Sequence, residues 1–403
     1  MSLKVLVLSR NYPNEVLPIL GLWVEGLVRY SQKYCDLRVV SPVPYCPPLP
    51  EGLGHYSQYR QIPQRETLNG IEVLHPRFLI GPGYSLHSFE AQAYYWGVRH
   101  AIDKLRHKFS FDVIHAHCVY PDGVVAARLG QRYGIPVVIT EHSLWHPWLD
   151  HYPQVRRQVV WAAKTCAAHV LASSGLQDSV ERFVGSSKQV RSIPIGVDTS
   201  LFTLPSQQGL RNLKQILYVG RVKFSKGVDY LLKAMSQLIQ HQPNLKLVLA
   251  GGGIWGYQSA EEMQLQQLAQ TLGLQNSVEF LGPRSPTEIA ALMQESGLVV
   301  LPSLRESFGA VLVEALACGT PVVATYCGGP EDIVNNSVGR LVPKENADAL
   351  AQAISHVLHQ HQTYEPLRLR NYAVENYAWE RVAAQTVDLY EEISRKPISS
   401  KVA

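Results

Sequence analysis

Two cations stand in a short loop between a predicted strand and a predicted helix. Arg221 and Lys226 follow the apolar run Ile216–Val219 and precede a helical pattern that begins at Val228. Ligands of open α/β sheets bind at the carboxyl ends of the strands, and a helix N-terminus there offers free N–H groups to an anion. The two cations therefore predict a diphosphate site, with a pair of solvated loop charges as the alternative.

Two glutamates, eight residues apart, form a second candidate site. Glu314 lies in a segment that we expect to be helical from Ser307 to Gly319, and Glu306 directly precedes it. Eight helical residues span about 12 Å, so the two carboxylates cannot act as a close catalytic pair but can reach opposite ends of one extended ligand. The free N–H groups of the first turn would face an anion between them. For Glu314, a buried structural carboxylate is the alternative, because its neighbours are apolar.

Three histidines and two tryptophans mark a third region. His115 and His117 stand two residues apart on a predicted strand and so share one face of the sheet, and His142 follows the next strand. Trp145 and Trp148 lie just downstream, in a segment whose aromatic rings suit stacking on a sugar or packing against lipid. A structural role is the alternative for each histidine, and a packed loop for the tryptophan segment.

A glycine-rich segment has the spacing of a dinucleotide-binding loop. Gly251–Gly256 follows the apolar run Leu245–Ala250 and matches the pattern G-x-G-x-x-G. In that fingerprint the helix opens directly from the glycines, whereas the helical pattern here begins near Ala260. We therefore expect no NAD(P) site.

Ten short apolar runs alternate with helical patterns along the chain. Runs of β-branched residues without polar alternation are typical of parallel strands covered on both faces, and ten strands exceed one ordinary sheet. The sequence therefore predicts an α/β protein with two Rossmann-like, doubly wound domains, residues 1–195 and 196–376, and a Pro- and Gly-rich insertion at residues 40–85. The expected strands are Val5–Leu8, Leu37–Val40, Val113–His115, Val137–Thr140, Val170–Ala172, Ile216–Val219, Leu245–Ala250, Val278–Leu281, Leu298–Pro302 and Val322–Ala324.

The composition excludes several classes of protein. With 46% hydrophobic and 17% charged residues, the 403-residue chain is neither disordered nor a coiled coil, and a net charge of +4 is too small for a nucleic-acid-binding protein. No apolar run reaches the ~18 residues of a membrane-spanning helix, and the N-terminal run is too short for a signal peptide. The six cysteines form no C-x-x-C pair and no metal-binding spacing, so we expect a reducing, cytoplasmic setting.

In their order along the chain, these motifs resemble those of the family 4, group 1 glycosyltransferases, which are retaining enzymes with the GT-B fold. The resemblance implies two Rossmann-like domains that face each other across a cleft, the first for the acceptor and the second for a nucleotide-sugar donor. It also implies that a helix at residues 377–396 packs back on the first domain. The matching segments are Asp112–His117, Thr140–His142, Pro194–Asp198 with Phe202, Gly220–Gly227 and Glu306–Val323.

The resemblance also implies roles in a donor site. Arg221 and Lys226 would hold the donor diphosphate and stabilise the leaving group. Glu306 would bind hydroxyls of the donor sugar, and Glu314 would bind those of the ribose. The other implied donor-binding positions are the backbone amides of Ser307, Phe308 and Gly309, the base-flanking Pro283 and Arg284, and Gly21 after the first strand, where the family has a Gly-Gly pair.

At the reacting end, the resemblance places His142 beside the donor sugar, which makes His142, Arg221, Lys226 and Glu306 the catalytic set. The acceptor would contact His117, Trp145 and Trp148. The implied reaction moves a sugar from a nucleoside diphosphate sugar, UDP by default, to an acceptor hydroxyl with retention, in polysaccharide or glycolipid biosynthesis. No metal, cofactor or nucleic acid is implied, and no D-x-D motif is present. The alternatives are a non-catalytic nucleotide-sugar-binding protein and a nucleotide-sugar hydrolase or epimerase.

The charge is divided unevenly between the two halves. Residues 1–200 carry 20 basic and 15 acidic residues, which leaves 20 − 15 = +5, and residues 201–403 carry 17 and 18, which leaves −1. Arg99, Lys104, Arg106 and Lys108 fall on one predicted helix of the basic half. We expect from this a weak peripheral contact with the inner face of an anionic membrane. A glycan or lipid-linked acceptor is implied by the family resemblance. Ordinary scatter of solvated charge is the alternative.

Overall fold

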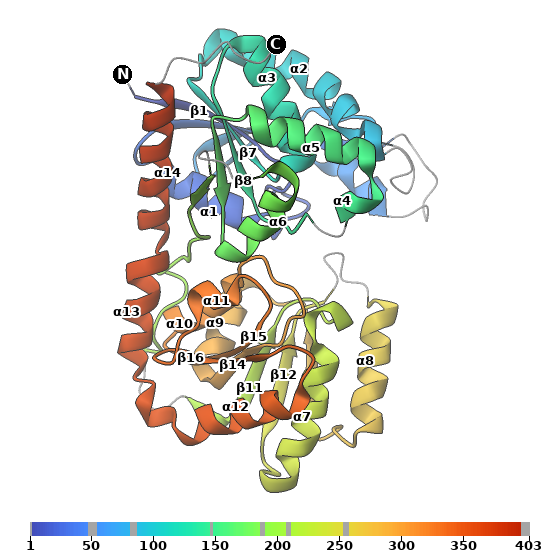
Figure 1. Cartoon of the computed structure of the whole chain (residues 1–403), viewed down its shortest axis with the longest axis vertical. Helices are drawn as coiled ribbons and strands as arrows, with labels where there is room; N and C mark the ends of the chain where they lie inside the picture. The colour runs from blue at the N-terminus through green and yellow to red at the C-terminus, as the bar shows by residue number, and fades with distance from the viewer. Residues whose placement is uncertain are drawn as a thin grey trace. The chain divides into compact units, whose positions relative to one another are not determined.

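The computed structural model describes residues 2–46, 55–80, 87–145, 148–185, 190–206, 211–252 and 258–395, with the side chains of Trp148 and of residues 55–57 excepted. The chain forms two compact units (Figure 1). Unit 1 comprises Met1–Pro194 and the segment that begins at Trp379, and unit 2 comprises Ile195–Ala378. Each unit is a Rossmann-like α/β fold, as the sequence predicts.

Unit 1 is built on an eight-stranded sheet. The strand order is β10-β9-β8-β7-β1-β2-β5-β4, and neighbouring strands are parallel except in the β4–β5 hairpin. All residues of β7 and β8 are buried, which explains why these strands show no polar alternation. The strands are β1 (Lys4–Leu8), β2 (Asp36–Val40), β4 (Arg65–Leu68), β5 (Ile71–Leu74), β7 (Val113–His117), β8 (Val137–Glu141), β9 (Ala168–Leu171) and β10 (Val190–Ser192), with a separate short pair β3 (Val43–Pro44) and β6 (Arg77–Phe78).

Helices connect these strands. Their buried positions recur at helical spacing, so each helix turns one apolar face to the rest of the unit. The helices of unit 1 are α1 (Leu22–Ser31), α2 (Glu90–Lys108), α3 (Val124–Tyr133), α4 (Trp148–His151), α5 (Pro153–Thr165), α6 (Ser174–Val184) and α14 (Trp379–Ser394). None of the described helices of the chain is long and apolar enough to cross a membrane.

Residues 40–85, which we expected to form an insertion, contribute strands β4 and β5 to the edge of the eight-stranded sheet where they are described. Strand β5 pairs in parallel with β2, and β4 pairs with β5 in an antiparallel hairpin. The turn between β4 and β5 is Asn69-Gly70, with φ values of 50° and 79°. A two-residue hairpin turn requires positive φ, and Asn-Gly is a favoured sequence for it. The pair was therefore a local signal for this hairpin.

The helix expected at residues 377–396 is present as α14, which spans Trp379–Ser394. Helix α13 (Pro366–Tyr377) belongs to unit 2, and α14 packs on α1 in unit 1. Tyr390 of α14 is buried, and its hydroxyl lies 2.6 Å from Nδ1 of His115 in β7. The chain thus leaves unit 1, builds unit 2 and returns to complete unit 1.

Unit 2 is a six-stranded, wholly parallel sheet in the order β13-β12-β11-β14-β15-β16. The order reverses direction between β11 and β14, and ligands of Rossmann sheets bind at the carboxyl side of such a switch point. The strands are β11 (Asn212–Val219), β12 (Lys246–Ala250), β13 (Val278–Gly282), β14 (Ser296–Leu301), β15 (Val322–Tyr326) and β16 (Gly339–Pro343). The helices are α7 (Val228–His241), α8 (Ala260–Thr271), α9 (Pro286–Glu295), α10 (Ala310–Ala317), α11 (Pro330–Ile333), α12 (Ala347–His359) and α13.

Candidate active site

The carboxyl ends of β11 and β14 bring three of the predicted residues to the switch point of unit 2. Arg221 and Lys226 follow β11, and Glu306 follows β14. Nζ of Lys226 lies 2.7 Å from Oε2 of Glu306, and the two side chains are only 20% and 16% exposed. The Ser303 hydroxyl donates to the same carboxylate oxygen at 3.3 Å. Arg221 is exposed, and its carbonyl accepts a hydrogen bond of 2.6 Å from the Tyr218 hydroxyl.

The loop that carries Lys226 packs closely against the residue that follows β14. Lys226 closes one turn of 3-10 helix, η5 (Phe224–Lys226), and Gly227 follows in the left-handed region with a φ of 66°. A Cβ atom on Gly227 would lie 1.9 Å from the carbonyl oxygen of Pro302. Only glycine permits both this conformation and this approach, so Gly227 determines how close Lys226 comes to Glu306.

A cavity of about 170 Å³ lies beside this ion pair. Its wall combines the ends of β11 and β14 with the first turn of α10. The N–H groups of a first helical turn have no partner within the helix and favour an anion. The lining residues are Tyr218, Val219, Gly220, Lys226, Leu301, Glu306, Gly309, Ala310 and Val311.

Helix α10 begins later than the sequence predicts. It starts at Ala310 after Gly309, whose φ of 97° ends the irregular loop, so Ser307 does not begin the helix. Glu306 lies in extended backbone instead, where its N–H donates to the carbonyl of Cys327 at 3.2 Å. The estimate of about 12 Å assumed that one continuous helix carries both glutamates, and this assumption is wrong because only Glu314 belongs to α10.

Glu314 is a partly buried carboxyl group within apolar helix α10. Burial raises the pKa of its carboxyl group to about 7. Among the described residues, no hydrogen bond or ion pair of this carboxylate is found. A carboxyl group in this state gains more from a hydrogen-bond donor on a ligand than a solvated one would.

The predicted base-flanking residues lie farther along the same edge of the sheet. Pro283 and Arg284 follow β13, two strands from β11, and Arg284 Nε is 3.9 Å from the carboxylate of Glu288. The nearby helix α8 begins at Ala260, as expected, so no helix opens at Gly251. Residues 253–257 of the glycine-rich segment lie outside the described residues.

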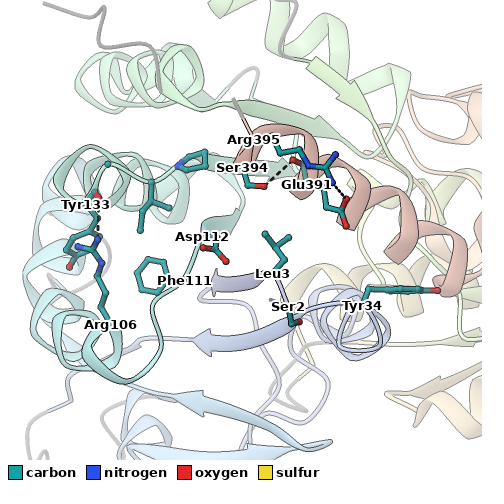
Figure 2. A pocket seen from close by; sticks show the side chains of 13 residues that line it. Ser2, Leu3, Tyr34, Arg106, Phe111, Asp112, Tyr133, Glu391, Ser394 and Arg395 are labelled. Carbon is teal, nitrogen blue, oxygen red and sulfur yellow. Dashed lines mark hydrogen bonds and ion pairs between the residues drawn. The ribbon is translucent and has the colours of Figure 1, made fainter. Parts of the chain in front are cut away.

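A second cavity lies in unit 1, at the amino ends of the strands. It has a volume of about 710 Å³ and lies where β1, β7 and β8 begin. Figure 2 shows Arg106 and Tyr133 on one side of it, and on the other side Glu391 of α14 and Arg395, which follows α14. The guanidinium of Arg106 lies over the Tyr133 ring at 4.5 Å. Because ligands of doubly wound sheets bind at the carboxyl ends of the strands, we do not assign the active site to this cavity.

Gly21 stands at the carboxyl edge of unit 1, at the start of α1. Its φ is 69°, and a Cβ atom there would lie 2.0 Å from the carbonyl oxygen of Asn11. The fold alone therefore requires glycine at this position. A role of its backbone toward a diphosphate remains an expectation.

The three histidines form one buried cluster at the ends of β7 and β8. Nδ1 of His117 lies 3.0 Å from Nε2 of His142, while Nε2 of His115 lies 2.7 Å from the hydroxyl of Thr140. Burial lowers the pKa of His115 to about 3 and that of His142 to about 4, and it holds the pKa of His117 well below its usual range. All three rings are therefore neutral at pH 7.

Trp145 is not available to an acceptor, which corrects the prediction. Its side chain is 0% exposed, its ring stacks on His169 at 5.5 Å, and its Nε1 donates to Oε2 of Glu141 at 2.7 Å. Trp148 lies at the start of α4, and its side chain is outside the described residues.

The sequence matches two families that together span most of the chain. Residues 31–201 match the family described as Glycosyltransferase Family 4, and residues 203–376 match Glycosyl transferases group 1. D-inositol 3-phosphate glycosyltransferase of Corynebacterium urealyticum is 31% identical over 316 residues, which cover 72% of this chain and 74% of that protein. This chain belongs to the family 4, group 1 glycosyltransferases.

Solved structures agree with the GT-B type of fold. Sucrose-phosphate synthase from Thermosynechococcus elongatus superposes with a TM-score of 0.79 at 22% identity, over 97% of this chain and 99% of that one. HepE of Anabaena, solved in complex with UDP, gives a TM-score of 0.73 at 23% identity, over 97% and 100% of the two chains. At these identities the likeness concerns the fold.

The glycosyltransferase also contains a buried charge cluster that the sequence analysis missed. Arg10, directly after β1, pairs with Glu90 of α2, and its backbone N–H donates to Asp122 at 2.7 Å. The Tyr94 hydroxyl donates to the same carboxylate at 2.9 Å, and burial raises the pKa of Asp122 to about 7. A cation at the end of the first apolar strand was a visible signal, but its partners come from 80 and 112 residues away.

Glu141 is the second feature that was missed. This fully buried carboxylate ends β8 and accepts hydrogen bonds from the backbone N–H groups of Val119, His142 and Ser143. Its adjacency to His142 could have identified it, because a carboxylate that ends an apolar strand must find donors. It fixes the backbone that presents His142. In the part of the chain that the structure describes, no group of three or more potential metal-ligating side chains is found.

Proposed function

We propose that this glycosyltransferase moves a sugar from a nucleoside diphosphate sugar to an acceptor hydroxyl, with retention at the anomeric carbon. UDP is the nucleoside diphosphate that we would test first. The observation that carries the proposal is the Lys226–Glu306 ion pair beside a cavity at the switch point of unit 2. A cation and a carboxylate, side by side, suit a ligand that joins an anionic diphosphate to neutral hydroxyl groups. The complexes of HepE with UDP and with UDP-glucose support the choice of donor.

Each residue of the site has a role in this proposal. Lys226 and Arg221 bind the diphosphate and stabilise the charge that develops on it as it leaves. Glu306 accepts hydrogen bonds from the donor sugar, and the backbone amides of Ser307 to Gly309 assist it. Glu314 binds the ribose hydroxyls, and the base lies near Pro283 and Arg284.

The proposed reaction needs no protein nucleophile. The bond between the anomeric carbon and the phosphate oxygen breaks, and the bond from that carbon to the acceptor oxygen forms on the same face. The acceptor proton passes to the leaving phosphate. The two protein cations supply positive charge at the diphosphate, so we propose that transfer is independent of metal ions.

A donor screen followed by product analysis tests this proposal. We expect UDP or another nucleoside diphosphate, but not NADH, to raise the melting temperature, and the matching sugar donor to give a product whose anomeric configuration equals that of the donor. Activity should survive EDTA. An inverted product contradicts the retaining reaction, and loss in EDTA that only a divalent ion reverses contradicts metal independence. Donor binding without product favours the non-catalytic alternative, while free or isomerised sugar without acceptor favours the hydrolase or epimerase.

Affinity for the donor should increase with pH because of Glu314. Its raised pKa of about 7 means that the carboxyl group is largely protonated at pH 6, and hydrogen bonds from ribose hydroxyls favour the charged form. Binding then releases a proton, so Kd should fall by up to about tenfold per pH unit below pH 7 and level off above it. Calorimetric titration with UDP-glucose from pH 6 to 8 measures this. Glu314→Gln serves as the control, and an equal pH slope in the two proteins would contradict the role.

We also propose that α2 mediates a peripheral contact of a cytoplasmic enzyme with an anionic membrane, where a lipid-linked or glycan acceptor is found. Phe89, just before α2, and Trp96 within it are 61% and 56% exposed, and the guanidinium of Arg99 lies 4.5 Å from the centre of a Trp96 ring. Lys104 and Lys108 of the same helix are exposed. Aromatic rings beside cations suit the interface of an anionic bilayer. Arg106 does not contribute in the same way, because it faces Tyr133.

Vesicle sedimentation tests the contact. The protein should bind vesicles that contain phosphatidylglycerol better than neutral phosphatidylcholine vesicles, because each basic residue near an anionic surface contributes about 1 kcal/mol. Trp96→Ala with Lys104→Glu should reduce binding about tenfold or more, whereas Lys233→Glu on α7 of unit 2 should not. Equal binding by the two variants would contradict a role of α2.

A further inference from the structure

A buried tyrosine lies near the end of the strand that precedes the two cations of unit 2. Tyr218 of β11 is fully buried, and it lines the cavity together with Lys226 and Glu306. Its hydroxyl donates a hydrogen bond of 2.6 Å to the backbone carbonyl of Arg221, three residues later. Burial, and then the charge of Glu306, raises the pKa of this hydroxyl above its usual value, so it keeps its proton and remains a donor at neutral pH.

Gly220 leaves room for this hydrogen bond. Its φ of 151° lies in the region that glycine favours, and a Cβ atom on it would lie 3.0 Å from the hydroxyl oxygen of Tyr218. The N–H of Gly220 donates to the carbonyl of Ala250 in β12 at 3.0 Å, so the turn is also tied to the neighbouring strand. Residues 218–221 thus form one compact turn at the start of the segment 220–227, which we call the cation loop.

The two ends of the cation loop are held in different ways. At the Lys226 end, the carbonyl of Ser225 accepts the N–H of Leu304 at 3.2 Å, which ties the backbone to the segment after β14. At the other end, the side chain of Arg221 is exposed, and no hydrogen bond or ion pair of its guanidinium is found among the described residues. In the same part of the chain, the Tyr218 hydroxyl is the one hydrogen-bond partner found for its backbone. The direction in which Arg221 leaves the loop therefore depends on this bond.

We propose that Tyr218 is a positioning residue: its hydroxyl holds the backbone of Arg221 in one conformation before the donor binds, so that the guanidinium meets the diphosphate without a prior rearrangement of the loop. This inference deepens the proposed function and rests on it for the ligand. Cations that are already in place stabilise a developing charge better than cations that must first be ordered. The single proton of the hydroxyl is used by the carbonyl of Arg221, so the tyrosine acts through the arginine.

Removal of one oxygen atom isolates this contact. Tyr218→Phe keeps the ring, and so the apolar packing of β11, but it leaves the carbonyl of Arg221 without its donor. The freed carbonyl can then turn toward water, and the start of the loop is no longer held in one conformation. Tyr372→Phe is the matched control, because Tyr372 also belongs to unit 2 and its hydroxyl donates to the backbone carbonyl of Ile333 at 2.9 Å. The control loses the same kind of bond outside the cation loop.

Amide hydrogen exchange of the full-length protein tests the loop without a ligand. The backbone N–H groups of Gly220, Lys226 and Gly227 are all hydrogen-bonded. We expect Tyr218→Phe to speed exchange at Gly220 about tenfold and at the other two amides by less, because these lie at the end of the loop that is held independently. Tyr372→Phe should leave all three amides unchanged. Exchange at Gly220 that is as slow in Tyr218→Phe as in the wild type would overturn the proposal, whatever ligand the enzyme uses.

Binding of UDP and of uridine separates the positioning of a cation from a general loosening of the site. Both ligands contain the base and the ribose, but only UDP carries the diphosphate. Tyr218→Phe should raise the Kd of UDP about tenfold and that of uridine less than about twofold, because a guanidinium interacts strongly with phosphate and not with a neutral nucleoside. Tyr372→Phe should change neither. An equal loss for the two ligands, or no loss for UDP, would overturn the role of Tyr218.

The effects of Tyr218 and Arg221 on UDP binding should not be additive. In Arg221→Ala there is no guanidinium to position, so the further change Tyr218→Phe should raise the Kd of UDP by less than about twofold more. A further tenfold loss in the double variant would mean that the tyrosine acts on Lys226 or on the ligand, and it would overturn the proposal.

The two measurements also separate this inference from the proposed function. If UDP does not bind the wild-type protein, the choice of donor is contradicted, while exchange at Gly220 still decides whether Tyr218 holds the loop. If UDP binds the wild type and Tyr218→Phe equally well, the proposed function stands and the inference fails.

Discussion

Replacing Lys226 by alanine should lower kcat for sugar transfer by about 10²–10³-fold, which is the usual effect of removing one preorganised donor from developing negative charge. The effect should be large because the Lys226 side chain is only 20% exposed and its ammonium group lies 2.7 Å from Glu306. Its loss removes the charge that would meet the diphosphate and also leaves a half-buried carboxylate unpaired. Steady-state kinetics with saturating donor and acceptor measure kcat.

Two controls interpret this result. Lys223 stands three residues earlier in the same loop, is 37% exposed and pairs with Glu261, so Lys223→Ala should stay within about twofold of wild type. The double variant Lys226→Ala with Glu306→Ala should be less impaired than the product of the two single effects, because the two side chains interact. A wild-type rate for Lys226→Ala would remove this lysine from the site.

The largest loss of stability is expected for Gly227→Ala. The added Cβ would lie 1.9 Å from the carbonyl oxygen of Pro302, in backbone with a φ of 66°. Positive φ costs about 1–3 kcal/mol for a residue with a side chain, and forced overpacking costs about 1–3 kcal/mol more. We therefore expect unfolding free energy to fall by about 3–5 kcal/mol in urea denaturation, with weaker donor binding in the protein that remains folded.

Gly273→Ala provides the matched control for this prediction. Gly273 also lies in unit 2, with a φ of 71°, but nothing stands within 4 Å of its added Cβ. Its substitution carries the conformational cost alone, about 1–2 kcal/mol. If the two variants lost the same stability, the contact with Pro302 would not be the cause, and the loop would be free to move away from β14.

The buried framework could be predicted from sequence because its strands are covered on both faces. Runs such as Leu298–Pro302 contain almost only apolar residues, so they identify the strands without knowledge of their partners. Strand β16 was missed because it contains Gly339, Arg340 and Pro343 and is only partly buried. Short strands at sheet edges carry a weaker pattern, and β10 and β4 were missed for the same reason.

Some of the site followed from the framework, and some depended on contacts distant in sequence. Arg221, Lys226 and Glu306 could be placed together because parallel strands bring their carboxyl ends to one edge. The start of α10 was misplaced because the cap preference of Ser307 was weighed without the positive φ of Gly309. The burial of Trp145 could not be predicted, because it depends on Glu141 and on packing against β9.

The return of the chain to unit 1 has a consequence during synthesis on the ribosome. Unit 2 is continuous, whereas unit 1 lacks α14 until the whole of Ile195–Ala378, 378 − 194 = 184 residues, has been made. At a synthesis rate of about 5–20 residues per second, α14 is made roughly 10–40 s after unit 1 has otherwise been completed. During this time α1 and His115 lack their contacts with α14 and with its Tyr390. The nascent unit 1 must therefore avoid aggregation while the apolar surface that α14 will cover is exposed. Its fold is completed only when α14 emerges from the ribosome.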